Sequence, residues 1–198
     1  LQSPDLESKQ QALQGVLQQA GKMSKLVNKL LQLSRADRHK ESLHLEEFDL
    51  SELTEMVAEE AQGLAESKAV TLTAEIEPGI LVKADQTLMM RIWLNLLTNA
   101  VKYGRQQGQI WLTLKSDGKN AVGTVRDDGI GISAAELPKI WKRFYRVNTA
   151  RSSGDDSGTG LGLAMVKWMV ESHGGTVSAV STLGAGSTFS FTIPLRPS

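Results

Sequence analysis

The chain has 198 residues, 22 acidic and 22 basic side chains, and no cysteine. A net charge of zero argues against nucleic-acid binding and against a membrane-surface role, and the lack of cysteine excludes disulfides and cysteine-based zinc sites. No apolar run is long enough to span a membrane. The length is enough for one domain with an extension, and the start at Leu1 rather than Met leads us to expect a fragment of a larger protein.

The first segment, to about residue 40, is predicted to be one long helix. The apolar side of this helix must pack against another helix, either within its own domain or in a helical hairpin. The apolar residues follow a seven-residue repeat, at Leu13, Val16, Leu17, Ala20, Met23, Val27, Leu30 and Leu31.

The following elements are expected to form one domain. Residues 41–48 are interpreted as a connector, and Ser51 as the cap of a helix that ends near residue 67. A second helix is expected at 86–103, and a third is expected to end at His173, just before two glycines. We therefore predict an α+β fold in which helices cover one face of one sheet. Alternating apolar residues and turn signals predict strands at residues 70–76, 80–83, 109–115, 121–126, 176–181 and 187–193.

A glycine-rich segment precedes the third helix. Glycines let backbone N–H groups approach an anion closely, and a helix start adds partial positive charge, so the segment suits a phosphate group. An ordinary turn before a core helix would have the same composition. The segment does not match the P-loop pattern. Its residues are Gly158, Thr159, Gly160, Leu161, Gly162 and Leu163.

Two further blocks lie upstream. Asn95, Asn99 and Lys102 are spaced to share one side of the second helix, with Tyr103 directly after them. Amides are poor helix formers in mid-helix, so they indicate a function, although capping or buried hydrogen bonds would also account for them. The other block runs from Asp127 through Gly129 and Gly131 to Ile132, at the end of a strand, where a simple turn is the alternative.

Together with residues 140–146, which include Arg143, Phe144 and Arg146, these blocks resemble a known family. They are similar in kind and order to the N, G1, F and G2 boxes of the catalytic ATP-binding domain of sensor histidine kinases, a group shared with gyrase, Hsp90 and MutL. The resemblance covers about residues 48–194. It implies a Bergerat-type two-layer α/β sandwich, with a mixed sheet covered on one face by helices and preceded by the long N-terminal helix.

The resemblance also implies roles in nucleotide binding for residues of the second predicted helix. Asn99 would supply an oxygen to Mg²⁺, which usually takes only one or two protein oxygens beside phosphate and water. Asn95 would position the γ-phosphate, and an amide is a poor general base. Lys102 would pair with phosphate oxygens, and Tyr103 would lie by the base or ribose.

In the other blocks, Asp127 would accept a hydrogen bond from the exocyclic amine of adenine, and Asp128 would be solvated, although the sequence leaves open which of the two points inward. The resemblance adds Gly129, Gly131, Ile132, Phe144 and residues 158–163 to the nucleotide-binding set. Residues 146–158 would form an ATP lid. One or both of Arg143 and Arg146 would reach the γ-phosphate, surface charge being the alternative.

The resulting domain prediction places the second helix of a dimerisation and phosphoacceptor hairpin, with a connector, at residues 1–45, and the catalytic domain at 46–198. The hairpin's first helix should carry a His-Glu-x-x-x-Pro block. His39, His44 and His173 are the chain's histidines, and none lies in such a block.

The function implied is transfer of the ATP γ-phosphate to a histidine on the missing helix, for relay to a response-regulator aspartate. ATP or ADP, Mg²⁺, the regulator and a second copy of the chain would be the partners. Nucleic acid and membrane would not be contacted by this fragment, which would be the cytoplasmic portion of a membrane sensor. A gyrase-type ATPase is disfavoured because Asn95 stands where a carboxylate would activate water, and a module that binds ATP without transfer is the non-enzymatic alternative.

Overall fold

The computed structural model describes residues 9, 13, 43–147 and 159–195. The chain divides into two compact units, Leu1–Ser42 and Leu43–Ser198, and the fold that is described belongs to the second. The predicted N-terminal helix lies outside the described residues except for Lys9 and Leu13, which are helical. Most of the predicted lid, residues 148–158, also lies outside them.

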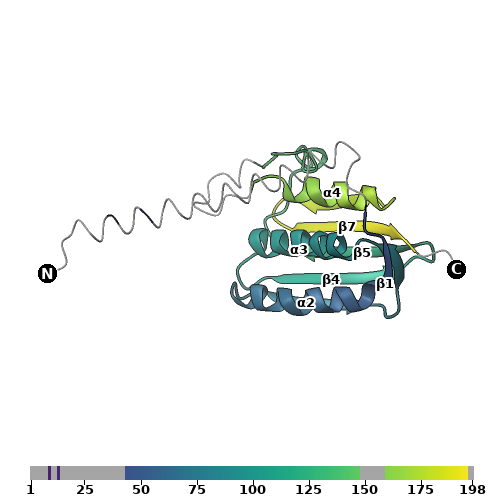
Figure 1. Cartoon of the computed structure of the whole chain (residues 1–198). Helices are drawn as coiled ribbons and strands as arrows, with labels where there is room; N and C mark the ends of the chain where they lie inside the picture. Colours follow the sequence, from purple (N-terminus) through teal and green to yellow (C-terminus); the bar gives the residue numbers. More distant parts are fainter. Residues whose placement is uncertain (1–8, 10–12, 14–42, 148–158, 196–198) are drawn as a thin grey trace. The chain divides into compact units, whose positions relative to one another are not determined.

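A five-stranded mixed sheet forms the centre of the second unit, in the order β2-β4-β5-β7-β6 (Figure 1). β2 runs parallel to β4, and the other neighbours are antiparallel. The strands are β2 Thr71–Ile76, β4 Gln109–Ser116, β5 Asn120–Asp127, β6 Val177–Thr182 and β7 Gly186–Pro194.

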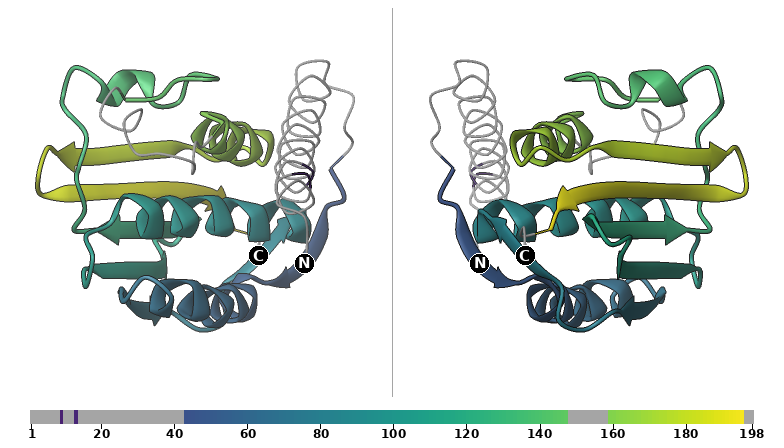
Figure 2. Two further views of the ribbon diagram at one scale, coloured as in Figure 1. Left: turned by 90° about the vertical axis from the view of Figure 1, so that its left-hand side faces the viewer. Right: turned by 90° about the vertical axis from the view of Figure 1, so that its right-hand side faces the viewer.

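Three helices pack along this sheet: α2 Leu50–Glu66, α3 Gln86–Tyr103 and α4 Gly162–Ser172. α3 lies between the other two and packs against both (Figures 1 and 2). The bounds of α3 agree with the predicted helix, and apolar residues at helical spacing along it are buried, namely Leu88, Ile92, Leu96 and Ala100. The predicted two-layer α+β fold is confirmed.

The core beneath α3 is centred on an aromatic pair. The rings of Trp93 and Phe191 meet edge to face, with centroids 4.8 Å apart. Gly123 on β5 lies directly against both rings, because a Cβ there would stand 2.3 Å from Phe191 Cζ and 2.7 Å from Trp93 Cη2. Glycine therefore creates the space that lets α3 approach the sheet.

The entry to the domain differs from the prediction. Glu46–Asp49 forms a strand, β1, where a connector was expected, and it pairs antiparallel with β3 (Leu81–Ala84) in a separate two-stranded sheet. β1 carries little apolar pattern, so its conformation comes from pairing rather than from local propensity. The predicted strand at residues 80–83 consequently lies outside the main sheet.

The cap of α2 is Asp49 and not, as predicted, Ser51. The Asp49 carboxylate accepts the backbone N–H of Ser51 at 2.7 Å. The Ser51 hydroxyl instead donates to the Glu77 carbonyl and accepts the Ile80 N–H, so it ties α2 to the turn before β3.

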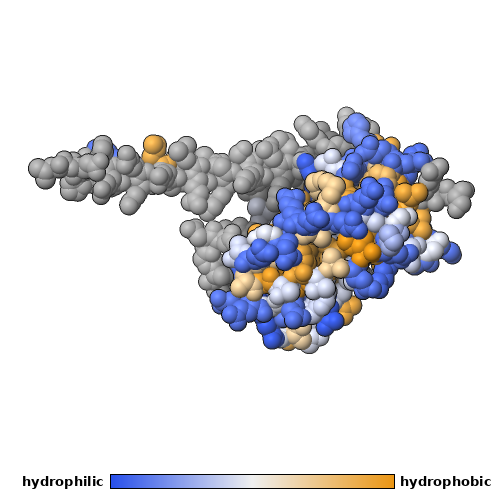
Figure 3. Space-filling model, turned by 90° about the horizontal axis from the view of Figure 1, so that it is seen from below, coloured by the Kyte–Doolittle hydropathy of each residue, from blue (hydrophilic) through white to orange (hydrophobic). Residues whose placement is uncertain are grey.

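The surface on the α2 side is mixed. Seen from there, hydrophilic residues surround small apolar patches (Figure 3). Met56 and Leu64 on α2 are exposed, whereas Ala65, next to Leu64, is buried. In the part of the chain that the structure describes, no helix combines the length and apolar character that a membrane span requires.

Candidate functional site

The predicted amides and the glycine-rich segment come together between α3 and α4. A Cβ on Gly162, the first residue of α4, would lie 3.2 Å from Asn95 Oδ1 and 3.9 Å from Asn99 Nδ2. Both amides are half-buried, and Asn95 Nδ2 donates to the Arg91 carbonyl at 2.7 Å. The start of α4 therefore stands directly against the polar side of α3.

The start of α4 has no side-chain cap. Leu161 is the N-cap residue and provides no capping hydrogen bond. Uncapped N–H groups at a helix start favour an anion. Gly160 precedes it with φ +69°, and a Cβ there would lie 2.8–3.0 Å from backbone atoms of Phe144 and Tyr145. Thr159 is half-buried, whereas Gly158 lies outside the described residues.

Asp127 is the inward-pointing member of the acidic pair. It is 4% exposed, and its Oδ1 accepts the Gly129 N–H at 2.9 Å. Burial raises the pKa of Asp127, and the charge of Asp128 adds to the rise, whereas hydrogen bonds from the N–H groups of Gly129 and Ser187 act in the opposite direction. Asp128 points elsewhere and accepts the Gln109 N–H at 3.1 Å.

The loop that follows Asp127 lies against the end of α3. The Ile130 N–H donates to the Tyr103 carbonyl at 3.1 Å, and a Cβ on Gly129 would lie 2.1 Å from that same carbonyl oxygen. Gly131 has φ +65° and abuts the Thr182 carbonyl. Only glycine fits at these two positions, so the loop backbone comes close to Tyr103 at Gly129 and to Thr182 at Gly131.

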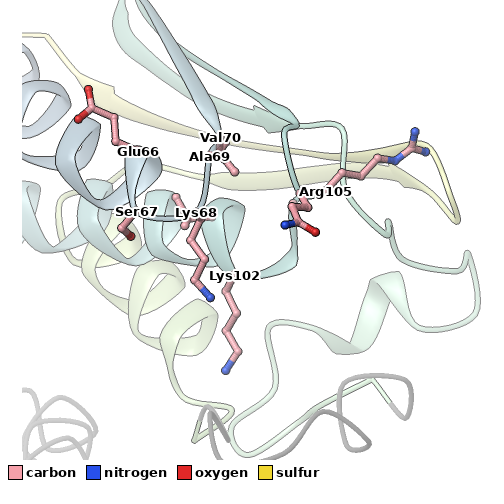
Figure 4. A pocket seen from close by; sticks show the side chains of 10 residues that line it. Glu66, Ser67, Lys68, Ala69, Val70, Lys102 and Arg105 are labelled. Carbon is pink, nitrogen blue, oxygen red and sulfur yellow. The ribbon is translucent and has the colours of Figure 1, made fainter.

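Lys102 and Tyr103 complete the predicted set on α3. Both are half-buried, and the Lys102 ammonium lies 5.6 Å from the Tyr103 ring centroid. Lys102 also borders a cleft of about 450 Å³ between the ends of α2 and α3. In that cleft the side chains of Lys68 and Lys102 run in the same direction, whereas Arg105 extends away (Figure 4).

The segment with the two predicted arginines is not helical beyond the short turn η1 (Leu137–Lys139). Phe144 has φ +61° and is 56% exposed, and the Tyr145 hydroxyl donates to the Glu136 carboxylate. Arg143 is exposed and Arg146 is half-buried. The structure thus places this segment beside the glycine-rich one, through the contact of Gly160 with Phe144.

Sequence reasoning missed two hydroxyl groups that lie next to the loop following Asp127. Ser181 and Ser187 face each other across β6 and β7, with oxygens 2.9 Å apart, and Ser181 also accepts the Ile132 N–H at 2.8 Å. A pair of serines flanking a tight hairpin was the available signal. Their contact with Ile132 depends on tertiary structure.

The side chains around the start of α4 limit the kind of metal ion that could bind there. Among residues 43–147 and 159–195 there is no group of three or more His, Asp or Glu side chains that could hold an ion. This set of side chains fits Mg²⁺ held by one amide and by phosphate oxygens, and it does not fit an ion enclosed by protein carboxylates.

Comparison with known sequences finds one matching family. The model described as histidine kinase-, DNA gyrase B-, and HSP90-like ATPase matches residues 84–197. The sensor histidine kinase TmoS of Ectopseudomonas mendocina is 38% identical over 173 residues, which is 87% of this chain and 18% of TmoS. The phosphate regulon sensor protein PhoR of Pseudomonas aeruginosa is 34% identical over 178 residues, 90% of this chain and 40% of PhoR. The chain thus spans less than half of either relative.

Solved structures show the same architecture. Full-length ShkA in complex with AMPPNP superimposes with a TM-score of 0.82 at 28% identity, covering 96% of this chain and 40% of ShkA. The catalytic domain of the histidine kinase ThkA in a nucleotide-free form has a TM-score of 0.68 at 25% identity, covering 78% of this chain and 99% of that domain.

Proposed function

Because the chain belongs to the family of histidine kinase-, DNA gyrase B- and HSP90-like ATPases, we propose that its second unit binds Mg·ATP between α3 and α4 and transfers the γ-phosphate to a histidine imidazole. The observation that carries this proposal is the approach of Gly162 to Asn95 and Asn99. A helix start with no side-chain cap faces two amides there, so phosphate oxygens and a metal ion would share the space between them.

Adenine is bound at the other end of the site. Asp127 is buried at the end of β5 beside Gly129, where a carboxylate accepts a hydrogen bond from an exocyclic amine. Guanine has no such amine at that position, so this group selects adenine nucleotides. Tyr103 lies against the loop that follows Asp127, Ile132 ends that loop, and both residues are half-buried.

Charge neutralisation is the chemistry that the phosphate end requires. Mg²⁺ would be held by Asn99 and would neutralise charge on the phosphates. Lys102, Arg143 and Arg146 would supply positive charge around the transferred group, and Phe144 and residues 158–163 would complete the binding set. Phosphoryl transfer depends mostly on positioning and charge, which such residues supply.

Transfer is favoured over hydrolysis because of Asn95. Its amide Nδ2 donates to the Arg91 carbonyl, and an amide does not activate water as a carboxylate would. The acceptor histidine would lie on a dimerisation helix, and a response-regulator aspartate would take the phosphate next. His173 is not the acceptor, because both of its ring nitrogens make hydrogen bonds inside the fold. The larger protein would work as a homodimer, with this part in the cytoplasm.

Asn99→Ala tests the metal site. We expect a loss of about tenfold or more in ATP affinity with Mg²⁺ present, and a much smaller loss with excess chelator, because only the metal-bound complex uses the amide oxygen. Thr98→Ala is the control on the same helix, since the Thr98 hydroxyl bonds only to carbonyls within α3. Equal losses in both conditions would show that Asn99 is structural.

A second experiment tests transfer itself. The chain is incubated with ATP labelled at the γ-phosphate, Mg²⁺ and a separate two-helix hairpin that carries an acceptor histidine. Acid-labile label on the hairpin is expected, at a rate limited by docking because the two parts are not linked. Steady ATP hydrolysis with no label on the hairpin would favour the ATPase alternative instead.

A further inference from the structure

The hydroxyl of Ser181, on the edge strand β6, makes three hydrogen bonds, to a backbone N–H, a backbone carbonyl and another hydroxyl. It donates to the Gly186 carbonyl at 2.8 Å, accepts the Ile132 N–H at 2.8 Å, and lies 2.9 Å from the Ser187 hydroxyl oxygen. A serine hydroxyl offers one proton and two lone pairs. Since its proton goes to Gly186, the Ser187 hydroxyl must be the donor in the third contact.

With this assignment, the proton and both lone pairs of the Ser181 hydroxyl are used in hydrogen bonds. The hydroxyl thereby links Ile132 and Ser187, which belong to two parts of the adenine end of the site. Ile132 ends the glycine loop that begins after Asp127. Ser187 lies opposite Asp127 in the β5–β7 register and is 7% exposed. One hydroxyl therefore fixes the far end of the loop and, through Ser187, the strand beside the buried carboxylate.

The near end of the loop is held by different bonds. The Ile130 N–H donates to the Tyr103 carbonyl, and the Gly184 N–H donates to the Ile130 carbonyl at 2.8 Å. Backbone groups make both of these bonds, so substitution of a side chain would not remove them. Within the described loop, the Ile132 N–H is held by a side chain, and that bond can be removed selectively.

We propose that Ser181 is a positioning residue for nucleotide binding, which acts by holding Ile132 and Ser187 in place around the base of an adenine nucleotide. The assignment rests on the proposed function of the site. Ser181 does not itself touch the nucleotide. Its effect should therefore be on the base end and should be the same whatever the number of phosphates.

The test measures the affinity of Ser181→Ala for AMP, ADP and ATP. We expect affinity for each nucleotide to fall by the same factor of about tenfold, as for the loss of one or two hydrogen bonds. Ser181→Thr keeps the hydroxyl and should restore binding. Ser178→Ala is the matched control, because Ser178 is an exposed serine of the same strand and should bind like the wild type.

Amide hydrogen exchange of nucleotide-free protein provides the second readout. The Ile132 amide should exchange at least about tenfold faster in Ser181→Ala than in the wild type, while the Ile130 amide should be unchanged. Unchanged affinity in Ser181→Ala would overturn the proposal, as would a folded Ser181→Thr that binds as weakly as the alanine variant. A wild-type chain that binds none of these nucleotides would overturn the proposed function itself and this assignment with it.

Discussion

The backbone N–H of Asp85 donates a hydrogen bond to Nε2 of His173 at 3.0 Å. Asp85 is the N-cap of α3, and His173 is the C-cap of α4, so the bond joins the start of α3 to the end of α4. Nδ1 of the same ring lies 2.7 Å from the Met169 carbonyl. Because Nε2 accepts, Nδ1 must carry the proton, and the ring is held as one neutral tautomer.

His173→Ala should therefore destabilise the domain. The substitution leaves the part-buried Asp85 N–H without its acceptor, which should cost about 1–3 kcal/mol of unfolding free energy. Denaturant titration of the nucleotide-free chain measures this. His44→Ala is the control, because the exposed His44 contacts Asp85 through its backbone N–H alone. A His173→Ala variant as stable as that control would show that the imidazole bridge contributes nothing.

Asp127→Asn should make the nucleotide-free protein more stable at neutral pH. Burial raises the pKa of Asp127, so the folded state binds this proton more tightly than the unfolded chain does. The stabilising contribution is complete below the ordinary carboxyl pKa of 3.8 and is lost as the pH rises through the raised value. The ionised form is thus a cost at pH 7. The melting temperature of the variant should exceed that of the wild type there, with the difference shrinking towards acid pH.

The same substitution should weaken binding. Asparagine mismatches one end of the hydrogen bond to adenine, and losing a charge-assisted bond of about 1.5–3 kcal/mol lowers affinity roughly tenfold to over a hundredfold. Calorimetric ATP titration checks this, with Asp128→Asn as control because the Asp128 carboxylate faces Gln109. Unchanged affinity in Asp127→Asn would remove Asp127 from the adenine site.

The inward orientation of Asp127, which the sequence alone left open, agrees with the two-residue period of β5. Alternate residues of β5 are buried from Ala121 to Asp127, so the two-residue period of a strand places Asp127 inward and Asp128 outward. The helix α3 was predictable in type and bounds, because its amphipathic period is strong and Asp85 caps it by accepting the Leu88 N–H.

Contacts between distant segments could not be predicted in this way. The spacing of Asn95 and Asn99 placed them on one side of a helix, but it contained no information that Gly162 would lie against that side. The pairing of strand β1 and the hydrogen bonds of the Ser181 hydroxyl could not be predicted for the same reason. Each depends on a partner far along the chain, and such partners are determined by packing rather than by local propensity.

Gly162→Ala tests the space between α3 and α4. A methyl group there would lie 3.2 Å from Asn95 Oδ1, tighter than an ordinary contact, and 3.9 Å from Asn99 Nδ2. The Asn95 amide can shift by a few tenths of an ångström, so the fold should survive. The shift moves an amide that we assign to the phosphate end. Affinity for Mg·ATP should fall about tenfold, as for the loss of one charge-assisted hydrogen bond of about 1.5 kcal/mol.

Gly63→Ala is the control that separates the two effects of adding a methyl group to a helix. Gly63 lies within α2, and nothing stands within 4 Å of its added Cβ. This variant should gain about 0.5–1 kcal/mol of stability from helix propensity and should bind nucleotide like the wild type. Gly162→Ala should keep its melting temperature close to that of the wild type and lose affinity. If both variants bound Mg·ATP equally well, the space beside Asn95 would not be where the phosphates lie, and the site would have to be sought elsewhere along α3.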